Sequence, residues 1–136
     1  YNLLEREVER ELLPAALAHG VGLLPYYPLA GGLLTGKYRK GAMPEGARLS
    51  TTPKLAGKYM VVENWRKLDA LERFCASRGR TLLDLAFAWL LSNPLTGSVI
   101  AGATRPEQVE ANVGAAGWML SPDDLDELNG LLDAAP

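Results

Sequence analysis

The chain has 136 residues, of which 48% are hydrophobic and 22% charged, a composition typical of one globular domain. A formal net charge of -2 excludes a general attraction to nucleic acid or to an anionic membrane, so any anion site must be built locally. The single cysteine, Cys75, excludes an internal disulfide framework and a cysteine-based zinc site, and it favours a reducing, cytoplasmic location. No apolar run is long enough to predict a transmembrane helix.

The first elements in chain order are two helices and a strand. The charged run from Glu5 to Glu11 predicts a helix. A second short helix is expected from Pro14 to Ala18, with Pro14 in its first turn and Gly20 ending it. The apolar run from Val21 to Tyr26 predicts a buried parallel strand. The Gly- and Pro-rich stretch from Tyr27 to about Lys58 is expected to be a long functional loop.

Two helices are predicted next. The first is indicated by an apolar stripe at helical spacing and is ended by Gly79. Its stripe consists of Trp65, Leu68, Leu71 and Cys75. The second begins at Thr81, where Asp84 three residues later completes a capping box. This helix is apolar on nearly every side, which predicts deep burial, and Asn93-Pro94 stops it.

The last third of the chain predicts a strand followed by two helices. The strand covers Ser98 to Ala101, and Gly102 leads into a helix from about Pro106 to Val113. The last helix starts at Ser121-Pro122. Its apolar face consists of Leu125, Leu128 and Leu132. Strands alternating with helices predict an α/β fold with parallel strands joined by helical crossovers.

Tyr26 to Tyr38, with the sequence YYPLAGGLLTGKY, is the first candidate site segment. An apolar strand runs directly into Ala30, Gly31 and Gly32, and such small residues let a ligand reach the backbone N–H groups. Lys37 adds a positive charge nearby. The alternative is a tight loop whose glycines serve only turn geometry.

Val99 to Asn112, with the sequence VIAGATRPEQVEAN, is the second candidate segment. The start of a helix presents free N–H groups and suits phosphate, and Thr104 and Arg105 supply a hydroxyl and a guanidinium there. Gln108 and Asn112 share one helix face, which could hydrogen-bond a nucleoside. The alternative is ordinary capping by Thr104 in front of solvated polar residues.

Three motifs together resemble the aldo-keto reductase family, in the branch that contains bacterial reductases and potassium-channel beta subunits. They are YNLLERE, GVGLLPYYPLAGGLLTGKY and GATRPEQVEAN, in the family's order and spacing over essentially the whole chain. The family folds as a (β/α)₈ TIM barrel, and this chain matches only its carboxy-terminal half. The resemblance therefore implies that residues 1–136 are a single partial barrel domain whose amino-terminal half is absent.

The resemblance implies a nicotinamide nucleotide site at the carboxy-terminal ends of the strands, and a reaction that reduces aldehydes or ketones. Tyr26 would stack on the nicotinamide, and Arg48 would contact the cofactor from the loop folded over it. The pyrophosphate would lie along Tyr27, Pro28, Leu29, Ala30 and Gly31, with Lys37. The adenosine and 2′-phosphate would be held by Gly102, Thr104, Arg105, Gln108 and Asn112. The cations Lys37, Arg48 and Arg105 favour NADPH over NADH, and both segments must then face one surface.

Two positions depart from the family pattern. Tyr27 stands where the family usually has serine, and Ala111 where it often has glutamate, so altered nucleotide affinity is expected. The tyrosine that gives the proton, with its aspartate, lysine and histidine, belongs to the first half of the family's barrel. No stretch here matches their motifs, so the chain alone is expected to be inactive. The resemblance to channel beta subunits leaves a second reading, a nucleotide-binding regulatory subunit with little catalysis.

The other potentially reactive residues are expected to have structural roles and no catalytic role. His19, the only histidine, is placed at a helix end, and Cys75 on the buried helix stripe. No metal site is expected. A partial barrel exposes strand edges, so the remainder of the barrel or a second copy is expected to cover them. The identity of the carbonyl substrate is not encoded in this segment.

Overall fold

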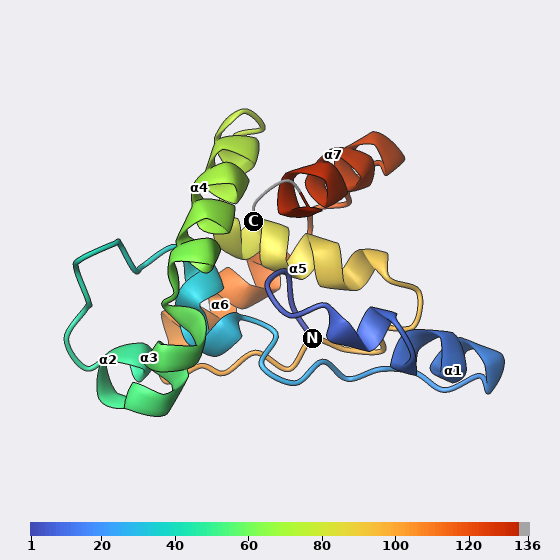
Figure 1. The fold of residues 1–136 in the computed structure, drawn as a ribbon, viewed down its shortest axis with the longest axis horizontal. Helices are drawn as coiled ribbons and strands as arrows, with labels where there is room; N and C mark the ends of the chain where they lie inside the picture. The colour runs from blue at the N-terminus through green and yellow to red at the C-terminus, as the bar shows by residue number, and fades with distance from the viewer. Residues whose placement is uncertain (134–136) are drawn as a thin grey trace.

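The computed structural model describes residues 1–133 and is dominated by helices (Figure 1). The short elements are the 3-10 helices η1 (Glu7–Glu9) and η2 (Ala30–Thr35) and the α-helices α1 (Leu12–Ala18), α2 (Arg48–Thr51) and α3 (Pro53–Tyr59). The long ones are α4 (Val62–Ala76), α5 (Leu82–Ser92), α6 (Pro106–Ala115) and α7 (Pro122–Asp133). Among these residues, no helix is both long and apolar enough to cross a membrane.

Helix α5 lies at the centre of the core and packs against η2, α4 and α6. The predicted capping box is confirmed: the Thr81 hydroxyl accepts from the Asp84 N–H at 3.1 Å, and the Asp84 carboxylate accepts from the Thr81 N–H at 2.8 Å. Every residue from Leu85 to Leu90 is buried, as its apolar sequence predicts. The helix ends at Asn93, whose extended backbone leads into Pro94.

The apolar faces predicted for the flanking helices are also confirmed. On α4, Leu68, Leu71 and Cys75 are buried and Trp65 is half-buried, and this face packs against the core. On α7, Leu128 and Leu132 are buried. Proline stands at the first position of α6, as predicted, and α6 extends two residues further than expected, to Ala115.

The stretch from Tyr27 to Lys58 contains η2, α2 and α3, so the prediction of one long structureless loop is wrong. Pro53 opens α3, because its fixed φ and missing N–H suit the first turn of a helix. Leu49 of α2 and Tyr59 of α3 are buried at about 1% exposure. Both short helices are therefore held by tertiary packing, since isolated helices of this length are unstable in water.

The two predicted strands are not formed as regular strands in the described part of the chain. The first segment forms a single parallel bridge, between Leu23 and Thr96, just before the second segment, and Leu23 O accepts from the Gly97 N–H at 2.9 Å. Pro25 lacks the N–H that a ladder needs, and two paired parallel strands alone are marginal. The burial expected for the first strand is also wrong, because Leu24 is 60% exposed; Ile100 in the second segment is 66% exposed.

The amino-terminal region is less helical than the sequence predicts. The run from Glu5 to Glu11 contains only the single 3-10 turn η1, which is flanked by the Arg6–Glu9 and Arg10–Glu7 ion pairs. Helix α1 starts at Leu12, so Pro14 lies in its first turn as predicted. Gly20, with a φ of 63°, follows the end of this helix, also as predicted.

Candidate functional site

The turn that follows the first apolar run has an unusual backbone that its neighbours hold in place. Tyr27 and Ala30 have φ values of 53° and 49°, a region that residues with a side chain seldom occupy. The buried Asn2 amide donates to the Tyr27 carbonyl at 2.9 Å, and the amino terminus donates to the Tyr26 carbonyl at 2.9 Å. These bonds fix the backbone carbonyls, and they leave the N–H groups of the turn for other partners.

Three backbone donors in this turn have no partner among the described residues. The N–H groups of Tyr27, Leu29 and Gly31 make no hydrogen bond to any of residues 1–133, while those of Ala30 and Gly32 bond within the turn. Pro28 has no N–H. Backbone donors near left-handed residues can form concave sites for anions. The three free donors alternate with residues 28 and 30 and do not follow one another, and they are available to an anion.

Gly31 and Gly32 each permit a close approach. A side chain at Gly31, whose φ is 67°, would place its Cβ 2.8 Å from Cδ2 of Leu49, so the absence of a side chain lets α2 pack on the turn. The Lys37 ammonium lies 3.5 Å from where a Cβ on Gly32 would stand, and 5.3 Å from the centre of the Tyr38 ring. Lys37 thus lies next to Gly32.

Two tyrosines and an arginine form the exposed side of the turn. The Tyr26 and Tyr27 rings meet edge to face at 4.3 Å, and Tyr26 is 77% exposed. The Arg48 guanidinium lies 5.2 Å from the Tyr27 ring centre and donates to its hydroxyl at 3.3 Å. A hydrogen bond with Tyr26, aided by the charge of Arg48, lowers the pKa of Tyr27, and the same hydrogen bond raises the pKa of Tyr26.

The second segment forms the start of α6, where Arg105 is the N-cap and Pro106 the first helical residue. The Thr104 N–H and hydroxyl both donate to the Gln108 side-chain oxygen, at 2.7 and 3.1 Å. Arg105 makes no side-chain capping bond, and Thr104 donates to Gln108 instead of accepting from the helix, so the alternative of ordinary capping by Thr104 is wrong. Gly102 and Asn112 also belong to this region, Gly102 exposed and Asn112 half-buried.

An open hollow of about 560 Å³ lies at the start of α6. Its lining consists of Ala103, Thr104, Arg105, Pro106, Val109 and Glu110. Two of the predicted nucleotide residues, Thr104 and Arg105, therefore line it. Glu110 lines the same hollow as Arg105, and Glu107 lies in the first helical turn, so the negative charge at this helix end opposes a second anion there.

The chains that lead into the two candidate segments start side by side. The parallel bridge between Leu23 and Thr96 sets the chains that lead to them side by side, and in Figure 1 both chains run in the same direction from the end near α1. The elements that follow, η2 and α6, both pack against α5. That Gly31 and Arg105 face one surface stays a prediction.

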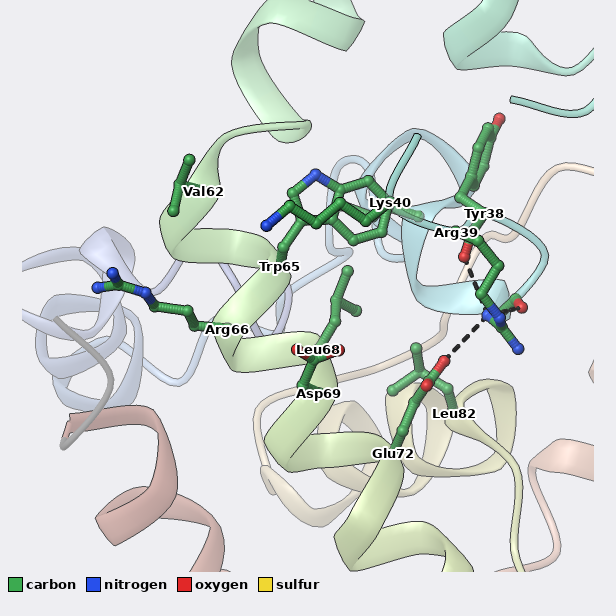
Figure 2. Close-up of a pocket in the computed structure, with 12 residues that line it drawn as sticks. Tyr38, Arg39, Lys40, Val62, Trp65, Arg66, Leu68, Asp69, Glu72 and Leu82 are labelled. Carbon is green, nitrogen blue, oxygen red and sulfur yellow. Dashed lines mark hydrogen bonds and ion pairs between the residues drawn. The ribbon is translucent and has the colours of Figure 1, made fainter. Parts of the chain in front are cut away.

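A separate hollow of about 220 Å³ lies between α4 and the turn after η2 (Figure 2). Its lining includes Tyr38, Lys40, Trp65 and Leu68 and none of the predicted nucleotide residues. An ion pair between Arg39 and Glu72, 3.1 Å apart, closes one side (Figure 2). Its mixed charge and apolar floor do not match the phosphate chemistry of the first two segments.

Neither His19 nor Cys75 lies in a catalytic arrangement. His19 is exposed at the end of α1, where its backbone N–H bonds the Ala15 carbonyl. Cys75 is buried at 2% exposure, and burial raises the pKa of its thiol to about 12. A thiol that stays protonated is a poor nucleophile.

Sequence reasoning missed the residues that support the turn. Besides Asn2, these residues include Glu5 and Tyr59. The Tyr59 hydroxyl and the Lys58 ammonium both bond the Glu5 carboxylate. The Tyr59 ring lies 6.5 Å from the Tyr27 ring. Burial, reinforced by the bond to Glu5, raises the pKa of Tyr59. No local pattern indicates these contacts, because they join residues 25 to 54 positions apart.

Comparison with known proteins identifies the family of this chain. A model of the aldo/keto reductase family matches residues 1–133, and the chain belongs to that family. A glycerol dehydrogenase from Gluconobacter oxydans has a similar structure, with a TM-score of 0.79 and 28% identity over 99% of this chain and 41% of its own. The fold is accordingly part of an aldo-keto reductase barrel.

Curated relatives include both reductases and proteins named for channels. A probable voltage-gated potassium channel subunit beta from Arabidopsis thaliana is 41% identical over all of this chain. An L-glyceraldehyde 3-phosphate reductase from Escherichia coli O157:H7 is 39% identical over 85% of it, and an NADH-specific methylglyoxal reductase from strain K12 is 36% identical over 98%. The chain spans about two-fifths of the length of these proteins, from 34% to 43%.

Proposed function

We propose that this chain supplies the nucleotide-binding part of an NADPH-dependent reductase of aldehydes or ketones. It would correspond to the carboxy-terminal half of the barrel. The observation that carries the proposal is the turn from Tyr27 to Gly31, where three unpaired N–H groups lie beside the cations Lys37 and Arg48. Free amides combined with cations are what a pyrophosphate requires.

Each part of the nucleotide has a proposed partner in the chain. Tyr26, with its exposed ring, would stack on the nicotinamide, which when bound supplies the hydride for carbonyl reduction. The turn would hold the pyrophosphate, and Arg48 would close over it. The hollow at the start of α6 would take the adenosine, with Arg105 on the 2′-phosphate. The proton donor would lie outside this chain, since no catalytic arrangement is found among residues 1–133.

Fluorescence titration of NADPH and NADH against the chain tests the nucleotide site. The expected result is tighter binding of NADPH, with the preference lost in Arg105→Ala because the guanidinium no longer meets the 2′-phosphate. Arg73→Ala, on the exposed side of α4, is the matched control. Equal affinity for both nucleotides would remove the NADPH assignment, and binding of neither would remove the site. Tighter binding of NADPH is a stringent expectation, because Glu107 and Glu110 carry negative charge at the helix end that would hold the 2′-phosphate.

A second function is favoured by the similarity to proteins named as potassium channel beta subunits. In that case the nucleotide would bind and regulate, with little turnover. The two functions can be distinguished by assaying NADPH consumption in a protein that contains this chain together with the rest of the barrel. Consumption of NADPH with a panel of aldehydes would support the reductase, and binding without consumption would support the regulatory subunit.

We also propose that the exposed apolar residues near the bridge are covered in the complete assembly. Val21, Leu24 and Ile100 are each more than half exposed, an unusual number for so short a region. The cover would be the remainder of the barrel or a second copy. Sedimentation of the chain alone decides between them: a dimer supports the second copy, while a monomer or irregular aggregates favour the missing barrel part.

A further inference from the structure

Arg48 contacts an aromatic side chain and no carboxylate among residues 1–133, an arrangement that Arg80 shares through the Trp118 ring. Arg6, Arg10, Arg39 and Arg78 each pair with a carboxylate. Arg48 has no carboxylate partner among residues 1–133, and its guanidinium contacts the Tyr27 ring and hydroxyl instead. A neutral aromatic partner holds a guanidinium in place through its π electrons without cancelling its charge. Arg48 therefore remains a full cation for a further anion.

The Tyr27 side of this contact is held firmly. Its carbonyl is bonded by the buried Asn2, and its ring has the rings of Tyr26 at 4.3 Å and Tyr59 at 6.5 Å as neighbours. Tyr59 is itself buried and bonded to Glu5. The Tyr27 ring is thus a fixed surface rather than a freely rotating exposed side chain.

The Arg48 side is tethered through its neighbour Leu49. The Leu49 N–H donates to the buried Tyr38 hydroxyl at 3.1 Å, and the Leu49 side chain packs against Gly31. Between Tyr38 and Leu49, however, the chain is held mainly by its own turns, and most of its residues are exposed. The Tyr27 contact is consequently the side-chain interaction that fixes where the charge of Arg48 stands.

We propose that Tyr27 is a positioning residue that holds Arg48 over the turn from Tyr27 to Gly31 before any nucleotide arrives. This inference rests on the proposed function, since the anion it serves is the nucleotide pyrophosphate. A cation that is already in place loses less conformational entropy on binding. Serine, with no ring, would leave Arg48 free to move, and the dinucleotide would dissociate faster.

The first experiment needs no nucleotide. Trypsin cleavage after Arg48 is timed in the 136-residue chain and in Tyr27→Ser and Tyr27→Phe, with cleavage after Lys54 as the internal reference. We expect Tyr27→Ser to accelerate cleavage at Arg48 relative to Lys54, because the side chain is released. Tyr27→Phe keeps the ring and should stay close to the unsubstituted chain. Equal relative rates in all three proteins would overturn the proposal.

The second experiment is a double-mutant cycle on nucleotide affinity. Tyr27→Ser should weaken NADPH binding about two- to fivefold, the size of one exposed cation–π contact. The loss should vanish in the Arg48→Ala background, because Tyr27 acts through Arg48. A loss that persists there would overturn the positioning role. If the unsubstituted chain binds neither nucleotide, the proposed function fails, and the cleavage result alone decides whether Tyr27 positions Arg48.

Discussion

The Asn2 side chain donates a hydrogen bond of 2.9 Å to the carbonyl of Tyr27, a residue 25 positions further along the chain. Its side-chain oxygen also accepts from the N–H groups of Leu4 and Glu5, at 2.9 and 3.1 Å. One fully buried amide therefore ties the start of the chain to the left-handed residue that opens the candidate site.

Asn2→Asp should test this tie, because it removes the amide donor and places a carboxylate against the Tyr27 carbonyl and the Glu5 carboxylate, to which the amide also donates. The loss of a buried hydrogen bond is expected to lower the free energy of unfolding by about 1–3 kcal/mol in urea denaturation. Asn129→Asp, on the half-buried side of α7, is the matched control and should change it much less. Similar losses in both variants would show that the bond to Tyr27 is unimportant.

Gly31→Ala is predicted to be more harmful than Gly41→Ala. Both glycines have positive φ, 67° and 81°, so both substitutions carry backbone strain of about 1–3 kcal/mol. Only Gly31 has a neighbour in the way: the new Cβ would lie 2.8 Å from Leu49, whereas Gly41 has nothing within 4 Å. The difference between their unfolding free energies measures the packing of α2 on the turn, and a difference of zero would contradict it.

Lys37→Met should weaken NADPH and NADH equally, in contrast to Arg105→Ala. The Lys37 ammonium lies over Gly32, beside the proposed pyrophosphate, and both nucleotides carry that group. Lys40→Met is the control, since Lys40 lines the separate hollow in Figure 2. A loss confined to NADPH would instead indicate that Lys37 contacts the 2′-phosphate. Titration of both nucleotides distinguishes the two assignments.

Cys75 should react with iodoacetamide only when the chain unfolds. Burial raises the pKa of its thiol to about 12, so little thiolate is present near neutral pH, and the side chain is 2% exposed. Alkylation followed by mass spectrometry should be slow in buffer and fast in urea, with the same midpoint as helix loss by circular dichroism. Rapid modification in buffer would mean that α4 opens locally.

Asp124 should contribute to stability above its pKa and lose that contribution in acid. Hydrogen bonds from the Ser121 N–H and hydroxyl, with the nearby Arg78, lower its pKa in the folded chain. Because the folded pKa lies below the unfolded value of about 3.9, the stabilisation is complete above that pH and disappears as the pH falls through the folded pKa. Asp124→Asn should flatten this part of the pH profile of unfolding, and Asp123→Asn should not.

The parts of the fold that sequence reasoning predicted correctly are those with local causes. Thr81 and Asp84 cap a helix three residues apart, and proline at 106 and 122 opens helices because of its own geometry. The segments 21–26 and 98–101 were predicted wrongly because strand formation depends on partners far along the chain. The helix opened by Pro53 carried the same proline signal, but its apolar pattern is too short to be seen.

The candidate site divides in the same way. The glycines and Lys37 were recognisable, since small residues and a cation follow an apolar run within a few positions. Asn2 and Tyr59 were not, because their contacts with Glu5 and Tyr27 exist only once the chain has folded. The partnership of Tyr27 with Arg48 was likewise invisible: the sequence identified both residues separately, and nothing in their spacing of 21 positions joins them.

The Gln108 oxygen already occupies both donors of Thr104. A nucleotide that used those donors would have to displace it, exchanging one oxygen for another with little net gain in hydrogen bonding. Selectivity at this end of the molecule would then depend on the balance of charge among Arg105, Glu107 and Glu110. A two-residue change that removed those carboxylates would strengthen the preference for NADPH without any new contact being made.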